Sequence, residues 1–220
     1  IKENVLVRKM NGIETAGNIN LLFTDKTGTI TTGNFKVSSL IDGNLHEYFS
    51  YNDVKMKGNF NKLVIKSLGN NNKCIYDGKI IGGNLTDQAL LKYVEYNKEN
   101  LNVKKEISFD SKNKYSYILT DNELIIKGAF EIIIDKCKYY YDTSGHKKYL
   151  INKEKIKNKA EQLASVGNRI IACAIKETAS IDLNDLTFVC MVNIEDEIKE
   201  NMLEVVNNLY LAGINVVMIT

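Results

Sequence analysis

A single carboxylate, Asp25, follows a short apolar run in the stretch LLFTDKTGTITTG. In open α/β sheets, reactive groups collect just beyond the carboxyl ends of strands, and a carboxylate there can be the nucleophile that forms an acyl-phosphate. The next residues offer positive charge, hydroxyls and a backbone that can approach an anion: Lys26, Thr27, Gly28 and Thr29. The stretch therefore predicts phosphoryl transfer, with Asp25 also able to ligate Mg²⁺. The structural alternative is an aspartate that caps a Thr/Gly turn.

The elements that must position Asp25 are predicted at both ends of the chain. Residues 18–24 form an apolar run that predicts a buried parallel strand ending at Asp25. Apolar residues recur at helical spacing over 200–211, Gly213 is expected to end this helix, and 214–220 is a second run of strand length. A helix, a glycine and a strand make one α/β unit, so both ends predict pieces of a parallel α/β domain.

The middle of the chain predicts an inserted α+β domain, because its strands and helices do not alternate strictly. Thr86 is the expected cap of a helix that carries Leu90 and Leu91. The other expected elements are a hairpin of 116–120 and 123–127, helices near 129–137 and 152–166, and strands over 170–175 and 186–194. The joints are expected near Gly33 and Asp196.

Composition narrows the class of protein. The chain has 220 residues, 44% hydrophobic and 25% charged residues, and a net charge of +2, which argues against a nucleic-acid partner. The four cysteines are far apart and form no C-x-x-C, so buried thiols in a reducing compartment are expected. No apolar run approaches the ~20 residues of a membrane span. Because the sequence lacks an initial Met and stops on an apolar run, it is expected to be a piece of a longer protein.

The string DKTGTIT resembles the phosphorylation signature of P-type ATPases, the ion pumps that phosphorylate an aspartate during transport. The resemblance continues in order along the chain, through GGNLTDQALL, FDSKNKYSYI, KGAFEIIIDKC, GNRIIACAIK and the run DLTFVCMVNIEDEIKENMLEVVNNLYLAGINVVMIT. These segments resemble the nucleotide-binding motifs, the hinge and the approach to the T-G-D motif of calcium-pump-like members. The chain stops at Thr220, the first residue of that triplet.

The resemblance implies a role for each matched residue. Asp25 would be the phosphorylated nucleophile, and Thr27 would help hold phosphate and Mg²⁺. Phe109 would stack on adenine. The remaining implied positions line the nucleotide pocket or reach the phosphates or the hinge: Asp87, Lys114, Lys127, Gly128, Arg169, Asp196 and Thr220. Taken singly, most of them have an ordinary structural alternative: a core phenylalanine, solvated lysines, or an aspartate in the first turn of a helix.

The implied fold is α/β plus α+β. A partial haloacid-dehalogenase-like (Rossmann-like) phosphorylation domain, residues 1–33 and 196–220, would be split by a nucleotide-binding domain with an antiparallel sheet, residues 34–195. The cofactors would be ATP and Mg²⁺. The partners would be the transmembrane and actuator domains of the same parent chain and a transported cation bound elsewhere. The fragment is expected on the cytoplasmic side of a membrane, most simply a bacterial plasma membrane, and is expected to bind nucleotide without pumping or turning over ATP.

Several positions depart from the family pattern. Prolines are replaced by Leu85, Phe130 and, at the hinge, by Glu197 and Ile198. Ser116 stands where the family usually has methionine, and Ser111 where it often has a basic residue. Because of these departures, the strength of nucleotide binding does not follow from the resemblance.

Two functions of another class remain open, a soluble haloacid-dehalogenase-type phosphatase and a nucleotide-binding module without chemistry. Thr27 argues against the phosphatase, because such enzymes often carry a second aspartate at this position as general acid. Among transported ions Ca²⁺ is the first choice, with Mg²⁺ or a monovalent cation open, because intramembrane groups set selectivity.

Overall fold

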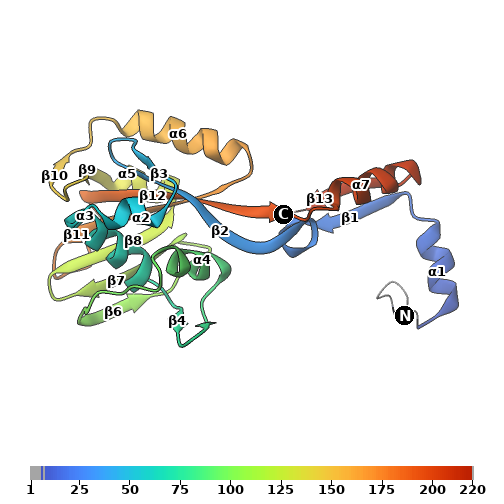
Figure 1. The fold of residues 1–220 in the computed structure, drawn as a ribbon, viewed down its shortest axis with the longest axis horizontal. Coiled ribbons are helices and arrows are strands. Elements are labelled where there is room, and N and C mark those ends of the chain that lie inside the picture. Colours follow the sequence, from blue (N-terminus) through green and yellow to red (C-terminus); the bar gives the residue numbers. More distant parts are fainter. Residues whose placement is uncertain (1–5, 7, 220) are drawn as a thin grey trace. The chain divides into compact units, whose positions relative to one another are not determined.

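The computed structural model describes residue 6 and residues 8–219 (Figure 1). The chain divides into two compact units. Unit 1 comprises Ile1–Asn34 and Asp196–Thr220, and unit 2 comprises Phe35–Glu195. The two connections between the units lie within strands β2 (Thr31–Asp42) and β12 (Leu186–Ile198). The assignment of these units to a phosphorylation domain and a nucleotide-binding domain stays a prediction.

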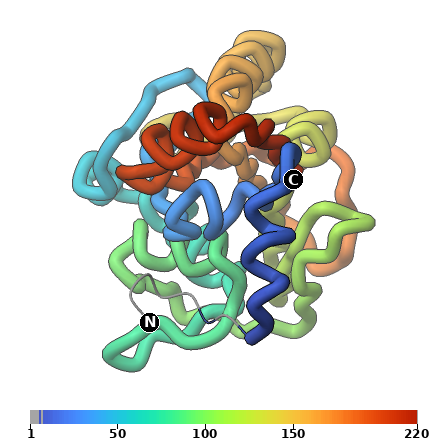
Figure 2. Tube along the Cα trace, turned by 90° about the vertical axis from the view of Figure 1, so that its right-hand side faces the viewer, coloured from blue at the N-terminus to red at the C-terminus, as the bar shows by residue number. Residues whose placement is uncertain are grey.

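Unit 1 contains the predicted α/β pieces. Its elements are α1 (Met10–Gly17), β1 (Leu21–Asp25), α7 (Met202–Leu211) and β13 (Asn215–Ile219), joined to β2 by the segment Lys26–Ile30. Strands β1 and β13 pair in parallel, with Asp25 opposite Ile219. Gly213, with φ of +78°, follows α7 and turns the chain into β13, which confirms the predicted helix, glycine and strand. Figure 2 shows α1 in dark blue and α7 in red.

The prediction of a buried first strand was wrong for this chain. In β1 the side chains of Leu21 and Phe23 are 43% and 58% exposed, and α7 has no buried residue. A sheet of two strands has two open edges, and α7, which contacts β13, leaves Leu21 and Phe23 exposed. The apolar pattern thus predicts the strand correctly, but not its burial.

Unit 2 is built on a nine-stranded sheet. The main strand order is β10-β9-β12-β11-β8-β7-β6; β2 also pairs with β12, and β3 pairs with β2. The pairs β6–β7, β7–β8, β8–β11 and β11–β12 are antiparallel, whereas β9 and β12 run parallel. The mainly antiparallel sheet confirms the predicted α+β character of this part.

The remaining bounds are as follows. The strands are β3 (Glu47–Tyr48), β6 (Val103–Ile107), β7 (Tyr115–Thr120), β8 (Glu123–Ala129), β9 (Cys137–Tyr141), β10 (Lys147–Tyr149) and β11 (Arg169–Glu177), with a separate hairpin of β4 (Ile75–Tyr76) and β5 (Ile80–Ile81). The helices are α2 (Tyr51–Lys55), α3 (Asn59–Ile65, continued by a turn over Lys66–Asn70), α4 (Leu85–Tyr93), α5 (Phe130–Lys136) and α6 (Lys153–Ser165).

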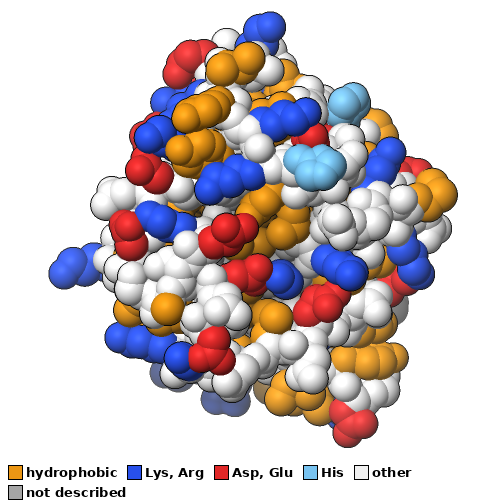
Figure 3. All heavy atoms as spheres, turned by 90° about the vertical axis from the view of Figure 1, so that its left-hand side faces the viewer, with side chains coloured by type: hydrophobic (Ala, Val, Ile, Leu, Met, Phe, Trp, Pro, Cys, Tyr) orange, Lys and Arg blue, Asp and Glu red, His pale blue; other side chains and the backbone are white. Residues whose placement is uncertain are grey.

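Two apolar cores lie on opposite faces of the sheet, because successive strand residues point to opposite faces. In β7 and β8, Ile118 and Ile125 belong to the core formed with α2, α3 and α4, whereas Leu119 and Leu124 belong to the core formed with α5 and α6. Strand β12 is covered on both faces and is buried from Leu186 to Ile194. On the face drawn in Figure 3, basic and acidic side chains intermingle with apolar ones, in keeping with the low net charge.

Candidate functional site

A buried ion pair joins β8 to α4 in unit 2. Lys127 Nζ lies 2.7 Å from Asp87 Oδ1, and the two side chains are only 7% and 10% exposed. Lys127 points to the same face as Ile125, two residues earlier, so a charge stands where the strand pattern favours an apolar side chain. Burying an unpaired charge is prohibitive, and Asp87 supplies the partner that makes this position tolerable.

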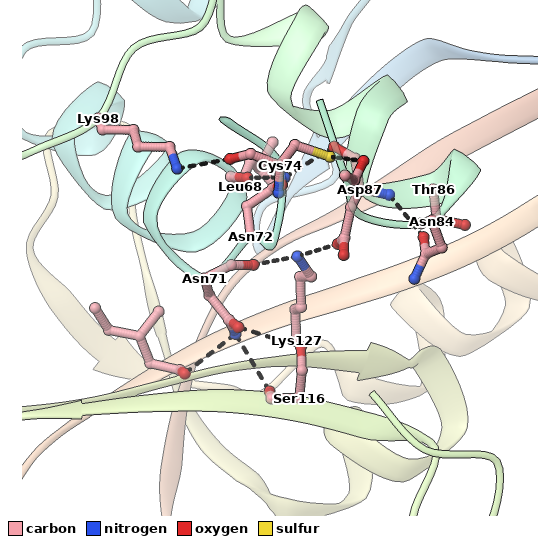
Figure 4. A network of polar contacts seen from close by, with 12 residues as sticks. Leu68, Asn71, Asn72, Cys74, Asn84, Thr86, Asp87, Lys98, Ser116 and Lys127 are labelled. Carbon is pink, nitrogen blue, oxygen red and sulfur yellow. Dashed lines mark hydrogen bonds and ion pairs between the residues drawn. The ribbon is translucent and has the colours of Figure 1, made fainter. Parts of the chain in front are cut away.

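Asn71 holds the ion pair in place from a loop after α3 (Figure 4). Its carbonyl accepts a hydrogen bond from Lys127 Nζ. Its amide Nδ2 donates to the carbonyls of Ser116 and Ile125, each at 3.2 Å, and its Oδ1 accepts from Ser116 Oγ at 3.2 Å. The serine at the position of the usual methionine is therefore used in a polar contact. Sequence reasoning missed Asn71, because three consecutive asparagines signal only a turn.

Asp87 is positioned by the start of α4. Asn84 is the cap of this helix, since its Oδ1 accepts a hydrogen bond from Asp87 N at 2.9 Å. The expected cap, Thr86, was wrong because Thr86 lies inside the first turn; its hydroxyl instead accepts from Arg169 Nη1 at 2.9 Å. The Arg169 guanidinium also lies 4.8 Å from the ring centroid of Phe35. Arg169 is thus held next to the residue that precedes Asp87.

Three of the implied nucleotide residues line one pocket: Asp87, Phe109 and Lys127. Phe109 is 48% exposed, so it is not a core phenylalanine. Asn71 and Ser116 line the same pocket. An aromatic face beside convergent polar groups is the usual chemistry of a site for a flat, hydrogen-bonding ring such as a nucleobase.

Lys114 and Gly128 shape the loop beside this pocket but do not line it. Lys114 has φ of +59°, and its carbonyl accepts a hydrogen bond from Ala129 N at 2.9 Å. A Cβ at Gly128 would lie 2.4 Å from that carbonyl oxygen, so only glycine fits there. The Lys114 ammonium lies 3.8 Å from Glu131 and is about half exposed.

The loop that carries Phe109 is stabilised by Asp110. The Asp110 carboxylate accepts hydrogen bonds from the backbone amides of Lys112 and Asn113 at 2.8 and 2.9 Å. The hydrogen bond from the Asn113 backbone is the main cause that lowers the pKa of this carboxyl, followed by the Asn113 side chain. These hydrogen bonds shape the turn that follows Phe109.

In unit 1, Asp25 ends β1 at the same edge as the end of β13, as expected of parallel strands. Gly28, with φ of +79°, turns the chain after it, and Gly28 N donates to Thr31 Oγ1 at 3.1 Å. Within the described residues, no group donates a hydrogen bond to the Asp25 carboxylate. The carboxylate is therefore available as a nucleophile or a cation ligand. Lys26, Thr27 and Thr29 lie in the same turn segment.

Asp196 joins the two strands that leave unit 1. Its carboxylate accepts hydrogen bonds from Thr31 Oγ1 at 2.6 Å and from Gly33 N at 3.1 Å. Lys199, which sequence reasoning missed, also bonds this turn: its Nζ donates to the carbonyl of Gly28 at 2.9 Å. The Asp196 side chain thus links the start of β2 to β12. Thr220, the last predicted site residue, lies outside the described residues.

No cluster of three or more His, Cys, Asp or Glu side chains that could hold a metal occurs in the described part of the chain. Asp25 and Thr27 offer oxygen atoms, the ligand type that Mg²⁺ prefers, and Mg²⁺ commonly uses one or two carboxylates together with substrate phosphates. These residues fit a Mg²⁺ ion that is completed by other ligands.

Comparison with known proteins identifies the relatives of this sequence. Residues 60–201 match the family model described as "P-type ATPase, cytoplasmic domain N". Over its full length the chain is 29% identical to calcium-transporting ATPase 1 of Saccharomyces cerevisiae and 25% identical to calcium-transporting ATPase 1 of Bacillus cereus, and it covers 27% of each. It is 26% identical to the sodium/potassium-transporting ATPase subunit alpha of Tetronarce californica and covers 26% of it. The chain thus spans about a quarter of the length of these curated relatives.

Proposed function

The chain belongs to the P-type ATPase family, and from this premise we propose that unit 2 binds an adenine nucleotide in the pocket lined by Asp87, Phe109 and Lys127. The observation that carries the proposal is the convergence of these three residues, which come from three separate motifs, on one pocket. Phe109 stacks on the base, and the buried Lys127–Asp87 pair supplies hydrogen-bonding groups at the back of the pocket. Arg169 and Lys114 are proposed to meet the phosphates.

Unit 1 carries the acceptor of the phosphoryl group in this proposal. A carboxylate oxygen of Asp25 attacks the γ-phosphorus of ATP, a new carboxyl O–P bond forms, the bond to the bridging oxygen breaks, and ADP leaves with that electron pair. Thr27, in place of a general-acid aspartate, lets the acyl-phosphate persist, as a transport cycle requires. When bound, Mg²⁺ neutralises phosphate charge, and Asp25 and Thr27 would hold it. Unit 1 is proposed to be part of a split haloacid-dehalogenase-like domain.

For the parent protein we propose ATP-driven cation transport. The names of most of the relatives favour Ca²⁺ as the transported ion. The sodium/potassium-transporting relative leaves a monovalent cation as the alternative. No helix in the described part of the chain is long and apolar enough to cross a membrane. The membrane-spanning and actuator domains are proposed to belong to the same parent chain, with the present chain on the cytoplasmic side, and a bacterial plasma membrane stays a prediction.

The test is calorimetric titration of the chain with ATP and ADP, with and without Mg²⁺. We expect micromolar-to-millimolar binding that weakens at least about fivefold in Phe109→Ala and Lys127→Ala, since each removes a stacking or charged contact worth about 1–3 kcal/mol. Tyr149→Ala is the matched aromatic control, because Tyr149 is 67% exposed and does not line this pocket. No binding by a folded chain would overturn the nucleotide site.

Turnover tests the second part of the proposal. The 220-residue chain is expected to bind ATP without steady hydrolysis, because Asp25 and Thr27 alone do not complete a Mg²⁺ site. Steady phosphate release that disappears in Asp25→Asn would contradict this expectation and favour a soluble phosphotransferase.

A further inference from the structure

The proposed nucleotide pocket is too small for a base in this structure. Its free volume is about 10 Å³. A volume of this kind of about 10–15 Å³ holds one water, whereas small-molecule sites usually measure about 300–1,000 Å³. If the pocket binds a base, as proposed above, its walls must move apart first. The following inference rests on that proposed function and concerns which contact must open.

One wall of the pocket is firmly anchored. Asn72 Nδ2 donates to the carbonyls of Leu68 and Asp87, each at 2.8 Å, and Asn72 Oδ1 accepts from Cys74 N at 2.9 Å. Together with the bonds of Asn71 to β7 and β8, these contacts tie the 71–74 loop to α3, to α4 and to the sheet. This wall is also joined to the interior by the buried Lys127–Asp87 pair.

The opposite wall is weakly held. It consists of the end of β6 and the residues that follow it, Ser108 and Phe109. Strand β6 is at the edge of the sheet, pairs with β7 on one side in the described chain, and all five of its residues are exposed. Its register with β7 is irregular between Val103 and Lys105. Segments with few buried contacts open at the lowest free energy, so this wall is the one expected to move.

Among the described residues, one ion pair connects the side chains of the two walls. Lys73 Nζ, on the anchored loop, lies 2.5 Å from Glu106 Oε1, on β6, and both residues line the pocket. We propose that Lys73 and Glu106 form a latch that holds the nucleotide pocket closed and that must open before a base can insert beside Phe109. Moving β6 away from the 71–74 loop separates these two charges, whereas it leaves the Lys127–Asp87 pair intact.

The effect of the latch on affinity can be estimated from the exposure of its two side chains. The side chains of Lys73 and Glu106 are 38% and 54% exposed, and a pair of this kind contributes up to about 1 kcal/mol, which corresponds to about fivefold in an equilibrium constant. The latch therefore lowers the affinity for a base by about two- to fivefold.

Charge alone would also change the affinity for ATP, so the experiment uses the uncharged nucleoside adenosine as well as ATP. The variants are Lys73→Gln, Glu106→Gln and the swap Lys73→Glu/Glu106→Lys. The matched control is the pair of Lys55 and Glu95, which is 2.8 Å apart, is similarly exposed, and lies neither on β6 nor in the lining of the pocket. Affinity is measured by calorimetry and the association rate by stopped-flow fluorescence.

The latch predicts that both single variants bind adenosine about two- to fivefold more tightly and faster and that the swap returns to the wild-type value. Lys55→Gln and Glu95→Gln should leave the affinity unchanged. Opposite effects of the two single variants on ATP, with none on adenosine, would show simple electrostatics and overturn the latch. If no chain binds either ligand, the nucleotide site itself falls, and the latch with it.

Discussion

At the scale of the residue, Lys127 is the most informative position. The strand pattern around it predicts an apolar side chain, yet a lysine is buried there with one aspartate and one carbonyl as partners. Buried ion pairs rarely add stability compared with apolar residues of similar size, because desolvation offsets the attraction. A pair retained at such a position is therefore better explained by what it binds than by what it stabilises.

This argument predicts how the pair responds to substitution. Lys127→Met should lower the free energy of unfolding by about 3–5 kcal/mol, because Asp87 is left buried without its partner. The double variant Lys127→Met/Asp87→Leu should recover most of that loss and still fail to bind ATP. Urea unfolding of both variants, combined with ATP titration, checks the prediction. A double variant as unstable as the single one would mean that the pair is needed for folding.

At the scale of the element, α4 connects local sequence to the site. Its Asn84 cap fixes the first turn, which places Asp87 against Lys127 and Thr86 against Arg169. A substitution of the cap residue is therefore expected to shift two contacts of the candidate site at once. The helix is predictable from its apolar spacing, but the choice between two neighbouring cap residues depends on where the first turn begins, and that is set by packing on the sheet.

Asn84→Ala should destabilise unit 2 by about 1 kcal/mol and weaken ATP binding several-fold, because Asp87 N loses its acceptor. Thr86→Ala is the matched control. It removes a hydroxyl two residues after Asn84, and this hydroxyl does not cap the helix. It should leave the unfolding midpoint nearly unchanged and affect only the contact with Arg169. Equal loss of stability in both variants, measured by urea unfolding, would refute the assignment of the cap.

Much of unit 2 was predictable from sequence because its signals are local. The hairpin around Asp121 and Asn122, with β7 and β8 on either side, follows from a two-residue turn between apolar runs, and α5 and α6 follow from apolar spacing. Asn71 was not predictable, because its partners lie 45 and 54 residues away on β7 and β8. The exposure of β1 was missed for a related reason. An apolar strand sequence predicts that the strand is buried, but it does not determine whether another part of the chain packs on it.

At the scale of the whole molecule, the two strands that leave unit 1, β2 and β12, pair with each other and are also linked by the Asp196 carboxylate. Both connections pass through strands, and Asp196 on one of them accepts hydrogen bonds from Thr31 and Gly33 on the other. Hydrogen bonds to a charged acceptor contribute more than neutral ones, about 1.5–3 kcal/mol each. Glu197 and Ile198 stand where the resembling family often has prolines, so no fixed proline φ stiffens these two positions.

Asp196→Ala should therefore loosen the connecting strands without unfolding unit 2, whose two cores do not include Asp196, Thr31 or Gly33. We expect limited proteolysis to cleave near Thr31–Asn34 or after Asp196 at least about tenfold faster, since the loss of one such bond corresponds to roughly that factor. Glu197→Gln is the matched control: it also removes one negative charge, but the Glu197 side chain is exposed. The urea midpoint of unit 2 should stay the same in both variants. Faster cleavage in Glu197→Gln as well would assign the effect to net charge at the joint rather than to the two hydrogen bonds.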